Sequence, residues 1–167
     1  MRGSAIRRMC CALLTVVHAT LFVAMPFTVG HSEVVPFATS GFTLTHEVVL
    51  PGTPEVIYDA FTGDIKPWWD HTWSGNPKAL YIEPKVGGGF YELFDESGNG
   101  TLHATVITAW RGKLLRMDGP LGLAGDAMAM VHTLAFSARG ADSTHIKLTA
   151  NGAGQIQDWV PAAVDGV

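Results

Sequence analysis

Three consecutive glycines at positions 87–89 constrain the fold of this chain more than any other feature. Each glycine loses much backbone entropy on ordering and offers no side chain to pack, so the run does not suit a helix or an ordinary strand interior. It is typical of a sharp bend, a bulge, or a close approach between two backbone segments. An aromatic segment at 90–94 follows directly, then a polar turn and a second strand-like segment at 101–110. We therefore predict a bent strand that continues into a β-hairpin.

The segment before this hairpin predicts a strand followed by one or two short helices. Residues 37–50 alternate between apolar and polar side chains, as in a half-buried strand. Thr53, Pro54 and Glu55 form a helix start, with an N-cap residue, a proline in the first turn and an early acidic residue. Residues 56–61 carry an apolar stripe with helical spacing. Residues 64–73 carry three tryptophans and predict a second short helix or an irregular turn.

The rest of the chain predicts further strands and a final helix. The expected strands cover 79–83, 113–118, 128–136 and 144–150, in addition to the two strands of the hairpin. We expect a loop at 151–154 and a short helix over 155–167 with one apolar side. The sequence shows no internal repeat and no low-complexity linker, which predicts a single domain.

The N-terminus has the layout of a secretory signal peptide. Arg2, Arg7 and Arg8 precede an apolar run from Met9 to about Met25. We expect a signal peptide at 1–30, a mature domain at 31–167, and a secreted or periplasmic location. The alternative is that an uncleaved leader anchors the protein in the membrane. Both cysteines of the chain lie inside this leader, so a mature domain would contain no disulfide and no thiol chemistry.

The charge of the predicted mature domain excludes several partners. Cleavage after position 30 removes three of the 11 basic residues and none of the 15 acidic ones, so the formal net charge moves from −4 to −7. An acidic domain without a basic run argues against nucleic acid and against stable association with an anionic membrane. The scattered histidines form no metal motif, and the glycine run lacks the Lys-Ser/Thr pair of a phosphate-binding loop. We expect no metal and no cofactor.

The order of the predicted elements is that of an α+β helix-grip fold, in which a curved antiparallel sheet wraps a C-terminal helix. The residues at 53–62, Trp68-Trp69 and Val86-Gly-Gly-Gly-Phe90 resemble the START-like (SRPBCC) superfamily. Within it they are most similar to the branch of the Hsp90 ATPase activator homologue domain, which is grouped with polyketide cyclases. The resemblance covers about 42–167 and implies a cavity for a hydrophobic ligand, with catalysis in some members. It also implies a long C-terminal helix, so we expect the short segment here to be truncated and to promote self-association.

Several residues are candidates for a site in such a cavity. Trp68 and Trp69 either border a pocket mouth or pack in the core. His132 lies on an otherwise apolar strand face, where it either contacts a ligand and transfers protons, or is a core histidine with a hydrogen-bond partner. Glu92 either points inward as a carboxylate with a raised pKa, or outward into solvent. The expected ligand-binding residues are Trp68, Trp69, Phe90, Met117, Met130 and His132, and the catalytic candidates are His132 and Glu92.

The sequence leaves three functions open. The first is an exported, non-catalytic protein that binds a small apolar molecule, with inward strand faces that include Leu44, Val48, Leu102, Val106 and Leu134. The second is a cyclase-like or hydratase-like enzyme that uses His132 or Glu92 for proton transfer. The third is a protein-interaction module of the Hsp90-activator type, which would not meet a cytosolic chaperone if the leader is functional.

Overall fold

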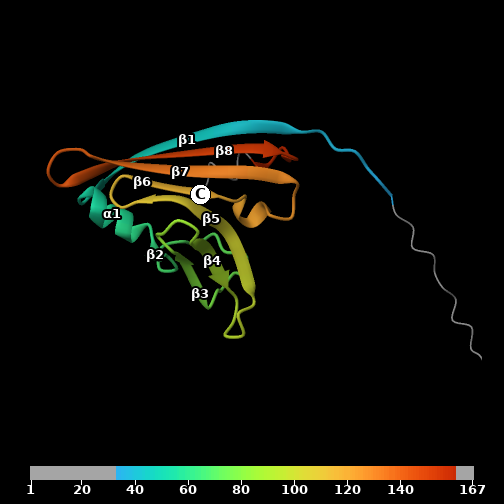
Figure 1. Cartoon of the computed structure of the whole chain (residues 1–167), viewed down its shortest axis with the longest axis horizontal. Coiled ribbons are helices and arrows are strands. Elements are labelled where there is room, and N and C mark those ends of the chain that lie inside the picture. Colours follow the sequence, from blue (N-terminus) through green and yellow to red (C-terminus); the bar gives the residue numbers. More distant parts are fainter. Residues whose placement is uncertain (1–32, 161–167) are drawn as a thin grey trace, which may run out of the picture. The chain divides into compact units, whose positions relative to one another are not determined.

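The computed structural model describes residues 33–160, in which eight strands form one antiparallel sheet (Figure 1). The strand order is β1-β8-β7-β6-β5-β4-β3-β2. The strands are β1 (Ser40–Pro51), β2 (Gly63–Asp64), β3 (Ala79–Ile82), β4 (Gly89–Leu93), β5 (Gly100–Trp110), β6 (Leu114–Asp118), β7 (Met128–Ala138) and β8 (Ser143–Gly154). The described residues also contain one α-helix, α1 (Pro54–Ala60), and a 3-10 turn, η1 (Leu121–Leu123). The predicted leader and residues 161–167 of the predicted last helix lie outside this range.

Two irregularities in β5 bend the sheet. Phe90 of β4 pairs with Ala104, whereas the next residue, Tyr91, pairs with Leu102, so His103 is an extra residue on β5. A second register shift between Val106 and Thr108 occurs in the pairing with β6. Bulges of this kind kink a strand and increase its twist. Figure 1 shows the result: β5 curves from the side of β6 and β7 toward the side of β3 and β4.

Helix α1 begins where the sequence predicts. The side chain of Thr53 accepts a hydrogen bond from the Val56 amide at 3.5 Å, and Pro54 occupies the first turn. The helix buries Ile57 and Tyr58, and the Tyr58 ring packs edge-to-face on Phe136 of β7 with 5.4 Å between ring centroids. This contact fixes α1 on the face of the sheet that carries the core. Among the described residues, no helix is long and apolar enough to cross a membrane.

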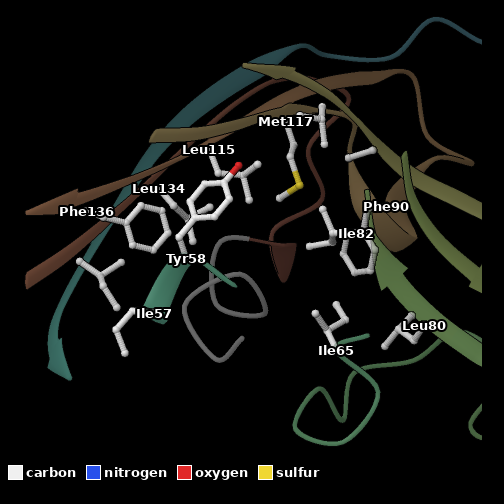
Figure 2. Packing of buried hydrophobic residues seen from close by; sticks show 13 residues of the cluster. Ile57, Tyr58, Ile65, Leu80, Ile82, Phe90, Leu115, Met117, Leu134 and Phe136 are labelled. Atoms are coloured by element: carbon white, nitrogen blue, oxygen red, sulfur yellow. The ribbon is translucent and has the colours of Figure 1, made fainter. Parts of the chain in front are cut away.

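The hydrophobic core collects side chains from α1 and from strands on both sides of the bend. Figure 2 shows Tyr58 and Phe136 on one side and Ile82 and Phe90 on the other, with Met117 directed between them. Further members of this buried cluster are Ile57, Ile65, Leu80, Ala104, Val106, Leu115, Leu134 and Ile146. The core therefore joins strands that are distant in the order of the sheet.

The glycine run makes the close approach that its composition predicts. Gly87 has a φ of 79°, and its amide donates to the Val106 carbonyl at 2.8 Å. A Cβ atom on Gly88 would lie 2.6 Å from the backbone oxygen of Glu83, which is closer than real Cβ contacts allow. The run is thus a tight connection between β3 and β4 whose backbone lies against β5.

Of the two alternatives predicted for residues 64–73, the structure has the irregular turn and no second helix; the amides of Trp68 and Trp69 both donate to the Ile65 carbonyl, and the turn goes no further. Two other local predictions were wrong. The predicted loop at 151–154 is the end of β8, because Gly152 allows the Phe42 ring of β1 to pack directly over the strand. Residues 155–159 form a bend and a turn, so the part of the last helix predicted there is absent.

Candidate functional site

A cavity of about 480 Å³ lies against the core-facing side of the sheet. Strands β1, β6, β7 and β8 supply one wall, and the tryptophan-bearing segment after β2 supplies another. Most side chains around it are apolar, and the polar ones are His46, Asp70, His71 and His132. Five of the sequence-predicted binding residues border this cavity: Trp68, Trp69, Phe90, Met117 and His132.

His132 on β7 is buried and has a partner. Its Nε2 lies 3.1 Å from the carbonyl oxygen of Gly119, which can only accept, so this nitrogen carries the hydrogen. Burial lowers the pKa of His132 from its ordinary value, and the hydrogen bond to Gly119 offsets only part of that effect. The neutral ring therefore borders the cavity as a polar group fixed in orientation. His46, in contrast, is exposed at the edge of the same cavity.

The two adjacent tryptophans are both structural anchors and cavity walls. The indole of Trp68 donates to the Ala60 carbonyl at 3.1 Å, and that of Trp69 donates to the His71 carbonyl at 2.6 Å. Trp69 also packs edge-to-face on Phe90 with 5.4 Å between centroids. The sequence leaves two interpretations open for Trp68 and Trp69, core packing and a pocket border. In the structure both side chains do both.

A second, smaller cavity of about 270 Å³ shares Trp69, His71, Phe90 and Leu121 with the first. Met130 borders this smaller cavity instead of the larger one. Its other walls include Trp73, the η1 turn, Trp159 and His103. Trp69 and Phe90 therefore contribute to both spaces.

Glu92 on β4 points inward and is completely buried. Its Oε1 accepts from the amide and the hydroxyl of Ser74, each at 2.7 Å. Its Oε2 accepts from the Trp73 amide at 2.8 Å and lies 2.9 Å from Nε2 of His103. Burial raises the pKa of the Glu92 carboxyl, but the hydrogen bonds from Ser74, Trp73 and His103 together outweigh it and hold the pKa below its ordinary value. The raised pKa considered for an inward Glu92 is therefore wrong.

His103 is the site residue that the sequence analysis missed. A regular strand would place Leu102, Ala104 and Val106 on one face, and the prediction puts Leu102 inward for that reason. The bulge shifts the alternation, so that His103 is only 5% exposed whereas Leu102 is 49% exposed. The prediction for Leu102 was wrong because an extra residue in a strand reverses the facing of every residue beyond it.

The described residues contain no group of three or more His, Cys, Asp or Glu side chains arranged to hold a metal ion. Glu92 and His103 form a pair, and the other partners of Glu92 are the backbone amides of Trp73 and Ser74 and the Ser74 hydroxyl.

Comparison with known proteins finds similar structures and no similar sequence. The sequence matches no family profile and no curated protein. The Mll3558 protein from Rhizobium loti has a similar structure, with a TM-score of 0.57 and 20% identity over 77% of this chain and 91% of that one. A protein of unknown function from Staphylococcus aureus, SA2116, gives a TM-score of 0.54 and 16% identity over 71% and 74% of the two chains.

An enzyme is also among the similar structures. Norcoclaurine synthase from Thalictrum flavum gives a TM-score of 0.50 and 13% identity, and the match covers 78% of this chain and 88% of the enzyme. Likeness at this level of identity shows a shared fold and carries no activity from one protein to another. The chain therefore shares its fold with these three proteins.

Proposed function

We propose that this chain binds a small apolar molecule in the larger cavity. The observation that carries the proposal is a space of about 480 Å³ that is walled mainly by apolar side chains and contains a few fixed polar groups such as His132. Ligand sites in proteins have this character: apolar walls supply affinity and a small number of polar atoms orient the ligand. Burial at roughly 25 cal/mol per Å², less the cost of ordering, would give an affinity in about the micromolar range.

Within the START-like fold, we assign the chain to the branch of the Hsp90 activator homologue and polyketide cyclase domains. The support is the resemblance at 53–62, the paired tryptophans and the glycine run. In the structure these segments are α1, the cavity wall and the tight connection before β4. The similar structures include one named as an enzyme, so the fold is compatible with either binding alone or catalysis.

Titration with a neutral, environment-sensitive apolar dye tests the binding proposal. Leu148 of β8 is partly buried and borders the larger cavity, so Leu148→Trp should fill the space and weaken dye binding at least tenfold. Leu148→Met conserves volume and serves as the matched control, with binding expected within about twofold of the wild type. Equal dye binding by Leu148→Trp and wild type would show that the cavity is not the site.

We also propose that the protein is exported. The support is the basic and then apolar N-terminal sequence, which is typical of a signal peptide. Intact-mass analysis of the protein recovered from its native host should show the loss of about the first 30 residues. Recovery of the full-length chain from the cytoplasmic fraction would contradict export.

A further inference from the structure

The Glu92–His103 pair has a geometry that an apolar binding site alone does not require. We propose that Nδ1 of His103 is a proton acceptor for a hydroxyl group of a ligand in the smaller cavity, with Glu92 as its positioning residue. The ligand class is a small molecule with one aromatic or similarly flat ring and one acidic hydroxyl of the phenol or enol type. The proposal concerns a different cavity from the proposed apolar site and goes beyond that function.

The hydrogen bonds around Glu92 determine which nitrogen of His103 carries the hydrogen. Three donors besides His103, from Trp73 and Ser74, approach the Glu92 carboxylate, which is ionised and can only accept. The fourth contact, 2.9 Å to Nε2 of His103, must therefore be a donation from that nitrogen. In the neutral ring Nδ1 then has a lone pair and no hydrogen.

The lone pair on Nδ1 has no hydrogen-bond partner within residues 33–160. The His103 side chain is only 5% exposed and Nδ1 itself is inaccessible to water, so a ligand hydroxyl reaches this atom only when the neighbouring side chains of the cavity wall shift. A buried acceptor without a partner destabilises the free protein, and a ligand that donates to it removes that penalty on binding. The site should therefore discriminate between a ligand with a hydroxyl and an isosteric ether.

The fold holds the His103 ring in place on the cavity wall. The bulge in β5 directs the side chain inward, and the ring packs against Phe90 with 4.8 Å between centroids. Bulges often re-aim a side chain next to a functional site. With Glu92 on one edge and Phe90 on one face, the ring has little freedom to rotate away from a ligand.

The smaller cavity suits a flat ring. Its walls include the aromatic side chains of Trp69, Trp73 and Phe90 together with Met130, and its volume is about 270 Å³. This volume is just below the usual range of about 300–1,000 Å³ for small-molecule sites, so a single ring with one or two substituents fits better than a large ligand. Aromatic walls favour edge-to-face and stacked contacts with such a ring.

The proton step needs no additional reactant. The O–H bond of the ligand breaks, its electron pair stays on the oxygen, and the proton forms a bond to Nδ1. The products are a ligand oxyanion and a His103 imidazolium. The Glu92 carboxylate, whose Oε2 lies 2.9 Å from Nε2 of His103, stabilises the positive charge of the imidazolium. This is the arrangement in which a carboxylate orients a histidine base and stabilises it once it is protonated.

The experiment compares two probes that differ in the hydroxyl hydrogen. 4-Nitrophenol can donate to Nδ1 and gives a visible absorption band when it ionises, whereas 4-nitroanisole has a methyl group in place of that hydrogen. The wild type should bind 4-nitrophenol at least tenfold more tightly than 4-nitroanisole. The bound nitrophenol should also be ionised at a lower pH than the free compound.

Two variants and one control assign the effect. His103→Phe keeps a ring against Phe90 but removes the acceptor. The ratio of the affinities for 4-nitrophenol and 4-nitroanisole should therefore fall to about one, while the affinity for 4-nitroanisole stays within twofold of the wild type. Glu92→Gln should reduce ionisation of the bound nitrophenol, because a neutral amide does not stabilise an imidazolium. His145→Gln alters a histidine that is paired with Glu47 at the sheet surface. It should change neither the preference for 4-nitrophenol nor the ionisation of the bound nitrophenol.

The wild-type measurement decides the proposal even if a variant fails to fold. Equal binding of both probes by the wild type would overturn the assignment of His103 as an acceptor and would leave the pair a structural one. Failure to bind either probe would overturn the smaller cavity as a site, whereas the apolar dye tests the larger cavity separately. An unchanged preference in a folded His103→Phe protein would also contradict the proposal.

Discussion

Replacement of Glu92 by glutamine should destabilise the protein more than any comparable change of an exposed glutamate. The carboxylate is completely buried and receives four hydrogen bonds at 2.7–2.9 Å. Glutamine has one acceptor oxygen and one NH2 group. If the NH2 group replaces Oε1 it faces the Ser74 amide, and if it replaces Oε2 it faces the Trp73 amide. In either orientation one backbone N–H loses its acceptor.

The size of the effect follows from the number of bonds lost. A hydrogen bond to a charged group contributes about 1.5–3 kcal/mol, and Glu92→Gln removes one and converts the others from charged to neutral. Trp73 and Ser74 are exposed, so water replaces part of the loss. We expect a decrease in the free energy of unfolding of about 2 kcal/mol, which corresponds to a fall in Tm of roughly 6–8 °C for a domain of this size.

Urea unfolding followed by tryptophan fluorescence measures this difference. Glu96→Gln is the matched control, because Glu96 is 80% exposed and pairs only with Lys78, and its effect should stay within about 0.5 kcal/mol. The pKa of Glu92 is below its ordinary value of 4.5, so the folded protein takes up its proton less readily than the unfolded chain. The stability gap between wild type and Glu92→Gln should therefore narrow as the pH falls below 4.5. A gap near zero at neutral pH, or one that does not change on acidification, would refute the reasoning.

Two other predictions concern His132 and the glycine run. Because burial lowers the pKa of His132 from its ordinary value of 6.5, the unfolded chain binds the proton first, and stability should fall as the pH decreases below 6.5. His132→Phe should flatten the dependence of the urea midpoint on pH below 6.5. A curve parallel to that of the wild type would contradict a role of His132 in this pH dependence. Gly88→Ala should destabilise by roughly 1–3 kcal/mol, because the new Cβ would lie 2.6 Å from the Glu83 backbone oxygen. Gly125→Ala, where no atom lies within 4 Å, is the control, and equal urea midpoints for the two alanine variants would show that the connection before β4 can relax.

The parts of the fold that follow from local chemistry could be predicted from the sequence. The helix start at Thr53 and Pro54 and the alternation of β7 and β8 have short-range causes, and the structure contains them. The glycine run was also informative, because three residues without side chains in succession indicate a close backbone approach. The placement of Met117 and His132 on the core-facing side followed from the same alternation.

The parts that could not be predicted depend on tertiary contacts. The inward position of His103 results from a bulge, and nothing in the composition of 100–110 marks the extra residue. The sequence predicts a loop at Gly152, but this residue lies in a strand because the Phe42 ring of a distant strand occupies the space of its missing side chain. The donors around Glu92 come from Trp73 and Ser74, which are 19 and 18 residues away in a segment without regular structure. Periodicity carries no information on such contacts.

The pairing of the first described strand with the last has a consequence for the order of folding. Every other neighbouring pair of strands is consecutive along the chain, whereas Thr43 of β1 meets Asn151 of β8 at a sequence separation of 108 residues. Such a long loop closes slowly, because its entropy must be lost before the contacts form. On the ribosome, β1 emerges first and has no strand to join until β8 has been synthesised. The sheet therefore cannot gain its full set of strand pairs until β8 has left the ribosome.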